Sequence, residues 1–150
     1  MSVVIVSTAI AAEPATPPSP PAAGAAEAPS DGLSPDVLVA RAQLLATKQD
    51  WPQAEQGYRD AIERHAERAD AWRGLGYVLR KQGRPPEALD AYEKATTLAP
   101  EDYDAWLGLG ETYVALGRVA DAEKVLERLR ERDRRNAATL HHVITTKTPR

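Results

Sequence analysis

The stretch DAWRGLG at residues 70–76 returns thirty-four positions later as DAWLGLG at residues 104–110, and the two copies differ only where Arg73 becomes Leu107. A catalytic loop is rarely needed twice in one chain, whereas a packing unit that stacks on a copy of itself must recur. An alignment of the chain with itself at this spacing gives three units. They span residues 35–68, 69–102 and 103–136. The duplication therefore predicts a structural repeat array.

Each unit carries two apolar patterns of helical type, separated by a turn. In the middle unit the first pattern recurs at i, i+3 and i+7, and the second at i, i+1, i+4 and i+7. Their residues are Trp72, Leu75 and Leu79, followed by Ala88, Leu89, Tyr92 and Ala95. Between the two patterns, Gly83 is expected to end the first helix and Pro85 or Pro86 to open the second. No strand pattern is present in the sequence, so each unit is predicted to be a helical hairpin.

Small residues mark the place where the two helices of a hairpin cross. Gly76 lies on the first helix and Ala88 near the start of the second. Two helices approach closely only where neither side chain is bulky. Trp72 and Tyr92 are then expected to fill the space around the crossing.

The pattern W-x2-L-G, followed by G, A, Y, A and P within a period of thirty-four residues, resembles the tetratricopeptide repeat (TPR). The middle unit carries it at Trp72, Leu75, Gly76, Gly83, Ala88, Tyr92, Ala95 and Pro100. The resemblance covers about residues 35–136 and is that of a generic bacterial TPR-repeat protein. It implies an all-α fold, a right-handed solenoid of three helical hairpins.

The outer units depart from this pattern, as is expected where a solenoid meets solvent. The first unit has Leu38 at the tryptophan position, and the third has Arg134 at the proline position. After Asn136, which is expected to cap a helix, an apolar stripe continues. It consists of Leu140, Val143 and Ile144. Residues 137–150 are therefore predicted to form a short C-terminal capping helix and a tail.

The N-terminal region resembles a leader rather than part of the repeats. Residues 3–10, VVIVSTAI, form an apolar run, and Ala9 and Ala11 stand in an A-x-A arrangement typical of signal-peptidase sites. No Lys or Arg precedes the run, so residues 1–11 are interpreted as an atypical signal sequence or as a non-specific apolar tail, with export favoured. Residues 12–34 are rich in Pro and Ala and are predicted to be a disordered linker. The expected location is exported or periplasmic, with the cytoplasm as the alternative.

The composition argues against catalysis and against metal or cofactor binding. The chain has 150 residues, a net charge of −3 and no cysteine, and every serine precedes residue 35. Of its three histidines, His141 and His142 are adjacent and would point about 100° apart on a helix, which is a poor arrangement for two metal ligands. The G-x-G triplets at 74–76 and 108–110 lie inside predicted helices, so they are not phosphate loops. We expect no enzyme activity, no cofactor and no metal.

The resemblance also implies where a partner would bind. In this family the first helices of the hairpins line the concave side, which commonly receives a peptide or helix from a partner protein. The helix faces opposite the Trp–Leu stripe supply the predicted groove residues. These are Val39, Gln43, Arg73, Tyr77, Arg80, Lys81, Leu107, Glu111 and Val114.

This set predicts the chemistry of a ligand. Arg73, Arg80 and Lys81 are expected to form a cationic patch, and Leu107 and Val114 an apolar strip. A matching ligand would be an extended or helical segment with a carboxylate beside an aliphatic side chain. The alternative is an ordinary solvated helix face, which commonly carries Arg, Lys and Glu.

A subset of the family clamps the terminal carboxylate of chaperones with Lys and Asn on these inner helices. The positions that would hold such a clamp are Val39, Gln43, Gly74, Asp104 and Gly108. Only Gln43 approaches the required chemistry, so this specificity is not expected here.

The predicted function is that of a non-catalytic protein–protein interaction module, an adaptor or assembly scaffold that holds a partner segment of unknown identity. Proteins of this kind occur in bacterial envelope, secretion and pilus assembly, which suits an exported chain, and the Ala- and Arg-rich composition suits a bacterium. One alternative is self-association through the end units. Another is weak binding of nucleic acid or an anionic surface through residues 124–135. That run alternates in charge sign, and the nearly neutral repeats make nucleic acid an unexpected partner.

Overall fold

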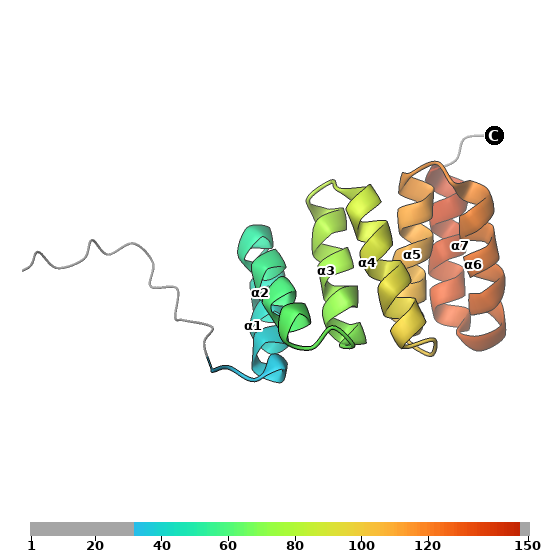
Figure 1. Ribbon diagram of the computed structural model, residues 1–150. Helices are drawn as coiled ribbons and strands as arrows, with labels where there is room; N and C mark the ends of the chain where they lie inside the picture. The colour runs from blue at the N-terminus through green and yellow to red at the C-terminus, as the bar shows by residue number, and fades with distance from the viewer. Residues whose placement is uncertain (1–31, 148–150) are drawn as a thin grey trace, which may run out of the picture.

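The computed structural model describes residues 32–147. The predicted signal segment 1–11 and nearly all of the predicted linker 12–34 therefore lie outside the described residues. Within the described range the chain forms seven α-helices and no strand, which confirms the predicted all-α class (Figure 1). The helices are α1 (Pro35–Thr47), α2 (Trp51–Arg64), α3 (Ala69–Lys81), α4 (Pro85–Leu98), α5 (Tyr103–Ala115), α6 (Val119–Arg132) and α7 (Arg134–Lys147).

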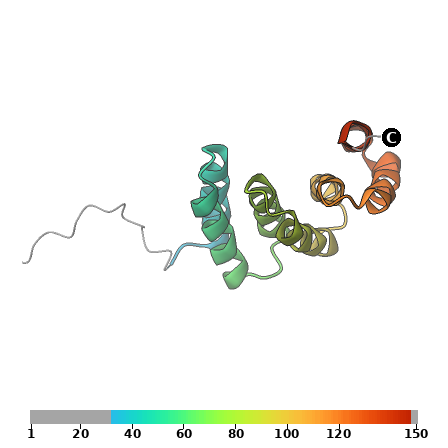
Figure 2. The ribbon, with the colours of Figure 1, turned by 90° about the horizontal axis from the view of Figure 1, so that it is seen from above.

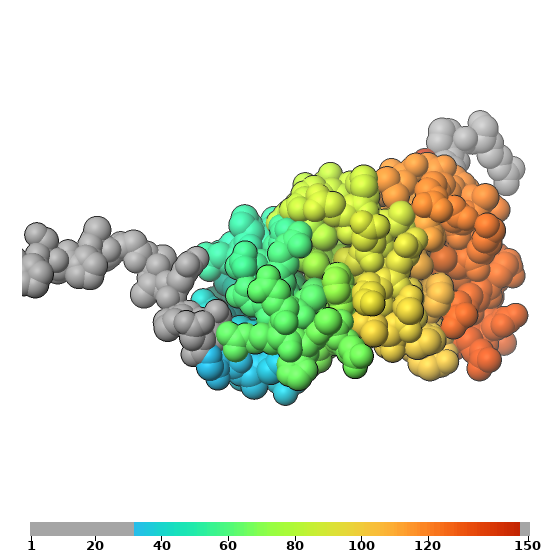
Figure 3. Space-filling view, viewed as in Figure 1, coloured from blue at the N-terminus to red at the C-terminus, as the bar shows by residue number. Residues whose placement is uncertain are grey.

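The helices are stacked as consecutive hairpins. Helices α1 and α2, α3 and α4, and α5 and α6 pack within the three predicted units, and each second helix contacts the first helix of the next unit. The first helices also contact one another, α1 with α3, α3 with α5 and α5 with α7. Seen from above, the hairpins follow one another in chain order, and their surfaces meet without a break from α1 to α7 (Figures 2 and 3). This is the architecture of a helical solenoid.

The helix ends follow from local sequence chemistry. Helices α1, α2 and α4 carry Pro in their first turn, where the missing N–H costs nothing. At the other end of α3, Gly83 adopts a positive φ of 76° and lets the chain leave the helix, and Gly117 does the same after α5 with a φ of 73°. The predicted turn between the helices of the middle unit, with Gly83 at its start and Pro85 opening the second helix, is confirmed.

Tyrosine rings pack against glycines on the first helices. A Cβ added at Gly76 would lie 2.9 Å from Cδ2 of Tyr92, so the close packing predicted there is present. The next unit approaches the same ring even more closely, since a Cβ at Gly108 would lie 2.3 Å from Cε1 of Tyr92. Gly74 stands in the same relation to Tyr58, at 2.3 Å. Each ring is thereby held against the following hairpin and is almost fully buried.

The C-terminal helix begins earlier than the sequence predicts. Helix α7 starts at Arg134 rather than after Asn136, because Oδ1 of Asp133 accepts hydrogen bonds from the backbone N–H groups of Arg135 (3.0 Å) and Asn136 (3.2 Å). Asn136 is not a cap: its side chain is buried and its Nδ2 donates to Oδ1 of Asp104 at 3.0 Å. Leu140 is fully buried, and α7 packs on both α5 and α6. It therefore covers the last hairpin.

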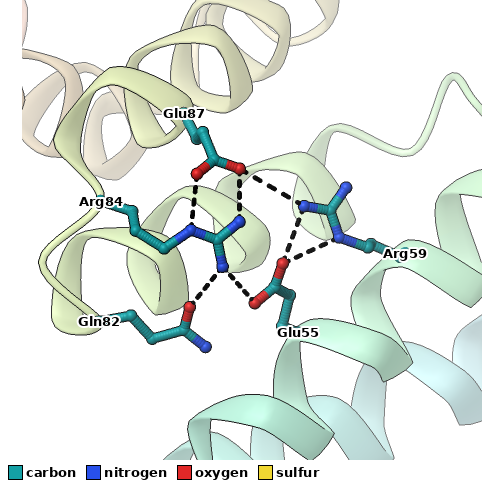
Figure 4. Close-up of polar contacts among 5 residues, drawn as sticks. All are labelled: Glu55, Arg59, Gln82, Arg84 and Glu87. Atoms are coloured by element: carbon teal, nitrogen blue, oxygen red, sulfur yellow. Dashed lines mark hydrogen bonds and ion pairs between the residues drawn. The ribbon is translucent and has the colours of Figure 1, made fainter.

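A polar network joins the first unit to the second (Figure 4). The guanidinium of Arg84, at the start of α4, donates to Oε2 of Glu55 on α2 (2.8 Å), to Oε1 of Gln82 (2.7 Å) and to Oε1 of Glu87 (2.6 Å). Arg59 donates to Oε1 of Glu55 at 2.8 Å. Burial raises the pKa of Glu55, but the hydrogen bonds from Arg59 and Arg84 outweigh it and hold that pKa below its ordinary value. The network stabilises the ionised form of Glu55 at the joint between two hairpins.

Candidate functional site

The first helices α1, α3 and α5 enclose a groove with a volume of about 570 Å³. Its size falls in the range of ordinary ligand pockets. Most of the predicted groove residues line it. They are Val39, Gln43, Arg73, Tyr77, Arg80, Leu107 and Glu111. The helical spacing thus brings side chains from all three units to one surface.

Two predicted groove residues do not line it. Lys81 is exposed near the end of α3, and its Nζ lies 5.4 Å from the centroid of the Tyr77 ring. Val114 is buried in the core near the end of α5, the helix that α7 covers. The predicted apolar strip of Leu107 and Val114 is therefore wrong, because only Leu107 lines the groove.

The predicted cationic patch is also wrong, because carboxylates on α5 and at its N-cap hold both arginines. Nε of Arg73 lies 3.0 Å from Oδ2 of Asp102, and its Nη1 lies 3.3 Å from Oδ2 of Asp104. Nη2 of Arg80 lies 2.7 Å from Oε2 of Glu111. The arginines therefore join neighbouring hairpins and leave no open patch of positive charge.

Tyrosines and glycines that the sequence assigned to packing or to the clamp form part of the groove. Tyr58 and Tyr92 line it, and their rings occupy the space that side chains at Gly74 and Gly108 would take. Burial raises the pKa of Tyr92 to about 12, although the nearby Arg80 acts in the opposite direction. The recurrence of these tyrosines and glycines every thirty-four residues is the sequence signal that could have identified them as groove residues.

An acidic row is the feature that the sequence analysis missed. Asp36, Asp70 and Asp104 recur every thirty-four residues as the second residue of α1, α3 and α5. Asp70 and Asp104 line the groove. At this position an acidic side chain stabilises the helix N-terminus, which explains the recurrence in structural terms. The row also sets the charge of one edge of the groove.

In the other candidate surface, residues 124–135, three of the six cations have local partners. Nζ of Lys124 lies 3.0 Å from Oδ1 of Asp121, and Nη1 of Arg130 lies 2.5 Å from Oε1 of Glu127. The guanidinium of Arg128 lies 4.2 Å from the centroid of the Trp106 ring. These contacts fit the charge-laced helix surface that the alternating sequence indicates.

Residues 32–147 offer no cluster of three or more His, Cys, Asp or Glu side chains placed to bind a metal ion. His141 and His142 are both exposed on α7. In the same range, no helix combines the length and the apolar character needed to cross a membrane.

Comparison with models of protein families identifies the family of this repeat array. Two family models, both described as tetratricopeptide repeat, match residues 39–102 and 79–143. The chain belongs to the tetratricopeptide-repeat family. Together the matches extend from α1 through the three hairpins into α7. No curated protein matches the chain at a significant level.

Solved TPR structures have the same fold. The TPR2B domain of yeast Sti1, in a complex with pHsp70, is 23% identical with a TM-score of 0.71, over 76% of this chain and 98% of that one. The TPR domain of Arabidopsis OM64 is 14% identical with a TM-score of 0.71, over 77% and 97%. The first TPR of Spaghetti (RPAP3), bound to the HSP90 peptide SRMEEVD, is 16% identical with a TM-score of 0.70, over 75% and 90%. At these identities the likeness shows the fold.

Proposed function

We propose that this TPR protein is a non-catalytic interaction module that holds a segment of a partner protein in the groove of α1, α3 and α5. The observation that carries the proposal is the groove itself, to which side chains from three consecutive units contribute. Within the duplicated heptad the one difference, Arg73 against Leu107, falls on residues that line this groove. Arg73 is held there by Asp102 and Asp104, whereas Leu107 presents an aliphatic side chain suited to contact with a ligand.

Two of the structural neighbours support peptide binding as a use of this fold, since one was solved with pHsp70 and the other with an HSP90 peptide. The same ligand is not proposed here. All five positions that correspond to the chaperone clamp line the groove, yet they hold Val39, Gln43, Gly74, Asp104 and Gly108. A carboxylate at Asp104 would repel a ligand carboxylate. An adaptor role in the bacterial envelope stays a prediction, which rests on the composition and on residues 1–11.

The test compares two leucine-to-glutamate variants of the full chain. Leu107→Glu places a charge in the groove, and Leu44→Glu places the same charge on the outer face of α1, where Leu44 is 56% exposed. After circular dichroism has shown equal folding, both are used to capture proteins from an extract of the native cell. Loss of a captured protein with Leu107→Glu alone supports the groove. Equal capture by both variants and the wild type would show that another surface binds.

Self-association is a second candidate, favoured by the outer face of α1. Val37 and Leu44 are 48% and 56% exposed there. The residues thirty-four positions later, Ala71 and Val78, are fully buried in the interior of the array. The first hairpin therefore presents at its open end the side-chain positions on which another hairpin would pack. Sedimentation equilibrium of the wild type and of Leu44→Glu tests this, and a wild-type monomer at high concentration would exclude it.

A further inference from the structure

We propose that the segment bound in the groove is basic and apolar, with Lys or Arg close to one bulky hydrophobic side chain. This inference rests on the proposed function and specifies the chemistry of the partner. It replaces the acidic ligand that the sequence suggested. Two features of the groove carry it, the excess of carboxylates along one edge and a middle lined by two tyrosines and Leu107.

The excess of negative charge follows from how the arginines are shared. Arg68 is paired with both Asp36 and Asp70, its Nη2 lying 2.6 Å from Oδ2 of Asp70. Arg73 is likewise paired with both Asp102 and Asp104. Each guanidinium thus serves two carboxylates, so each group of three carries one net negative charge. Of these two groups, Asp70, Arg73 and Asp104 line the groove itself, together with the neutral pair of Arg80 and Glu111, so the lining carries one net negative charge.

The carboxylates remain open to a further donor. The side chains of Asp36 and Asp104 are 79% and 69% exposed, and that of Asp70 is 41% exposed. An ionised carboxylate has about four acceptor sites. Asp104 uses one oxygen for Asn136 and the other for Arg73. A Lys or Arg of a ligand therefore adds to these groups, whereas a ligand carboxylate would have to displace one of them from its arginine.

The middle of the groove favours a bulky hydrophobic side chain in the ligand. The middle of the groove is lined by Tyr58 and Tyr92, which pack directly against Gly74 and Gly108, and by Leu107. The tyrosines are held by the packing of the next hairpin, so this floor is rigid before any ligand arrives. A large side chain placed here loses its contact with water without requiring a rearrangement, which favours an aromatic or branched aliphatic anchor.

The experiment is a selection from a random-heptapeptide phage library on the immobilised full chain. Enriched peptides are then synthesised with a fluorescent label and titrated by fluorescence anisotropy. The inference expects peptides that combine Lys or Arg with an aromatic or large aliphatic residue. It also expects their affinity to fall about two- to five-fold with Asp104→Asn, the range for one exposed charge pair, and less at high salt. Glu131→Gln removes a charge from an exposed site on α6 outside the groove and should leave affinity unchanged.

The outcomes separate this inference from the proposed function. Enriched acidic peptides that lose binding with Leu107→Glu would overturn the basic ligand and leave the groove as the binding site. Basic peptides that respond equally to Asp104→Asn and Glu131→Gln would overturn the role assigned to the acidic row. Peptides that bind Leu107→Ala, which removes the apolar contact without adding charge, as well as the wild type, or a selection that enriches nothing, would count against both the inference and the groove.

Discussion

Replacing Leu140 by alanine tests whether α7 covers the last hairpin as described. Leu140 is fully buried, and its two methyl groups occupy the space that a side chain at Gly110 would take, since a Cβ there would lie 2.5 Å from Cδ2. Buried Leu→Ala changes cost about 2–5 kcal/mol, more where the cavity cannot collapse. A glycine on the facing helix cannot fill the gap, so we expect about 3–5 kcal/mol and a fall in Tm of about 10–20 °C.

Leu44→Ala is the matched control, because the same atoms are removed from a side chain that is 56% exposed, and it should cost less than about 0.5 kcal/mol. Thermal and urea unfolding followed by circular dichroism measure both. The double variant Leu140→Ala/Gly110→Ala should recover about 1 kcal/mol, because the new methyl group fits once the leucine is shortened and alanine favours the helix. Equal stability of the two single variants, or no recovery in the double variant, would refute this account of the contact between α5 and α7.

Three further predictions concern charged and titratable groups. The pKa values of Glu55 and Asp70 in the folded protein lie below their ordinary values of 4.5 and 3.8, for Asp70 chiefly because Arg68 donates hydrogen bonds to it. The stability that these two carboxylates contribute is therefore present above the ordinary pKa values and is lost as the pH falls through the pKa values of the folded protein. Urea midpoints should therefore drop in acid, and less so in Glu55→Gln. Arg84→Met should lower stability only slightly, since Arg84 is partly exposed, and the loss measured by urea unfolding should shrink at high salt. Because burial raises the pKa of Tyr92 to about 12, a pH titration of tyrosinate absorbance should give the same curve for Tyr92→Phe and the wild type until the pH approaches that value.

The sequence predicted the fold because its information is local and repeated. Trp72, Gly76 and Tyr92 stand at spacings that only a helical hairpin brings together, and the second copy removes the ambiguity of a single match. The start of α7 was missed because it depends on a contact with a residue far away in the sequence. Asp133 and Asn136 are both good N-cap residues, and the choice between them depends on Asp104, which draws the Asn136 side chain inward.

The groove was predicted in position but not in charge. Helical spacing identifies which side chains share a face, so Arg73, Tyr77 and Leu107 were placed on one surface. Whether Arg73 is free or paired depends on side chains about thirty residues away on the next hairpin, and no pattern within one helix contains that information. The ion pairs with Asp102 and Asp104 appear only when the hairpins are stacked.

The stacked register explains the single difference between the two copies of the heptad. Arg73 in the middle unit is paired with Asp102 and Asp104, which lie 29 and 31 residues further along the chain. The same offsets from Leu107 lead to Asn136 and Ala138, and neither can accept an ion pair from an arginine. An arginine at position 107 would have no carboxylates like those that hold Arg73, whereas an aliphatic residue there needs no ion-pair partner. The ion pairs of this position therefore end where the third unit meets α7, and Leu107 presents an aliphatic side chain to the groove between Asp104 and Glu111.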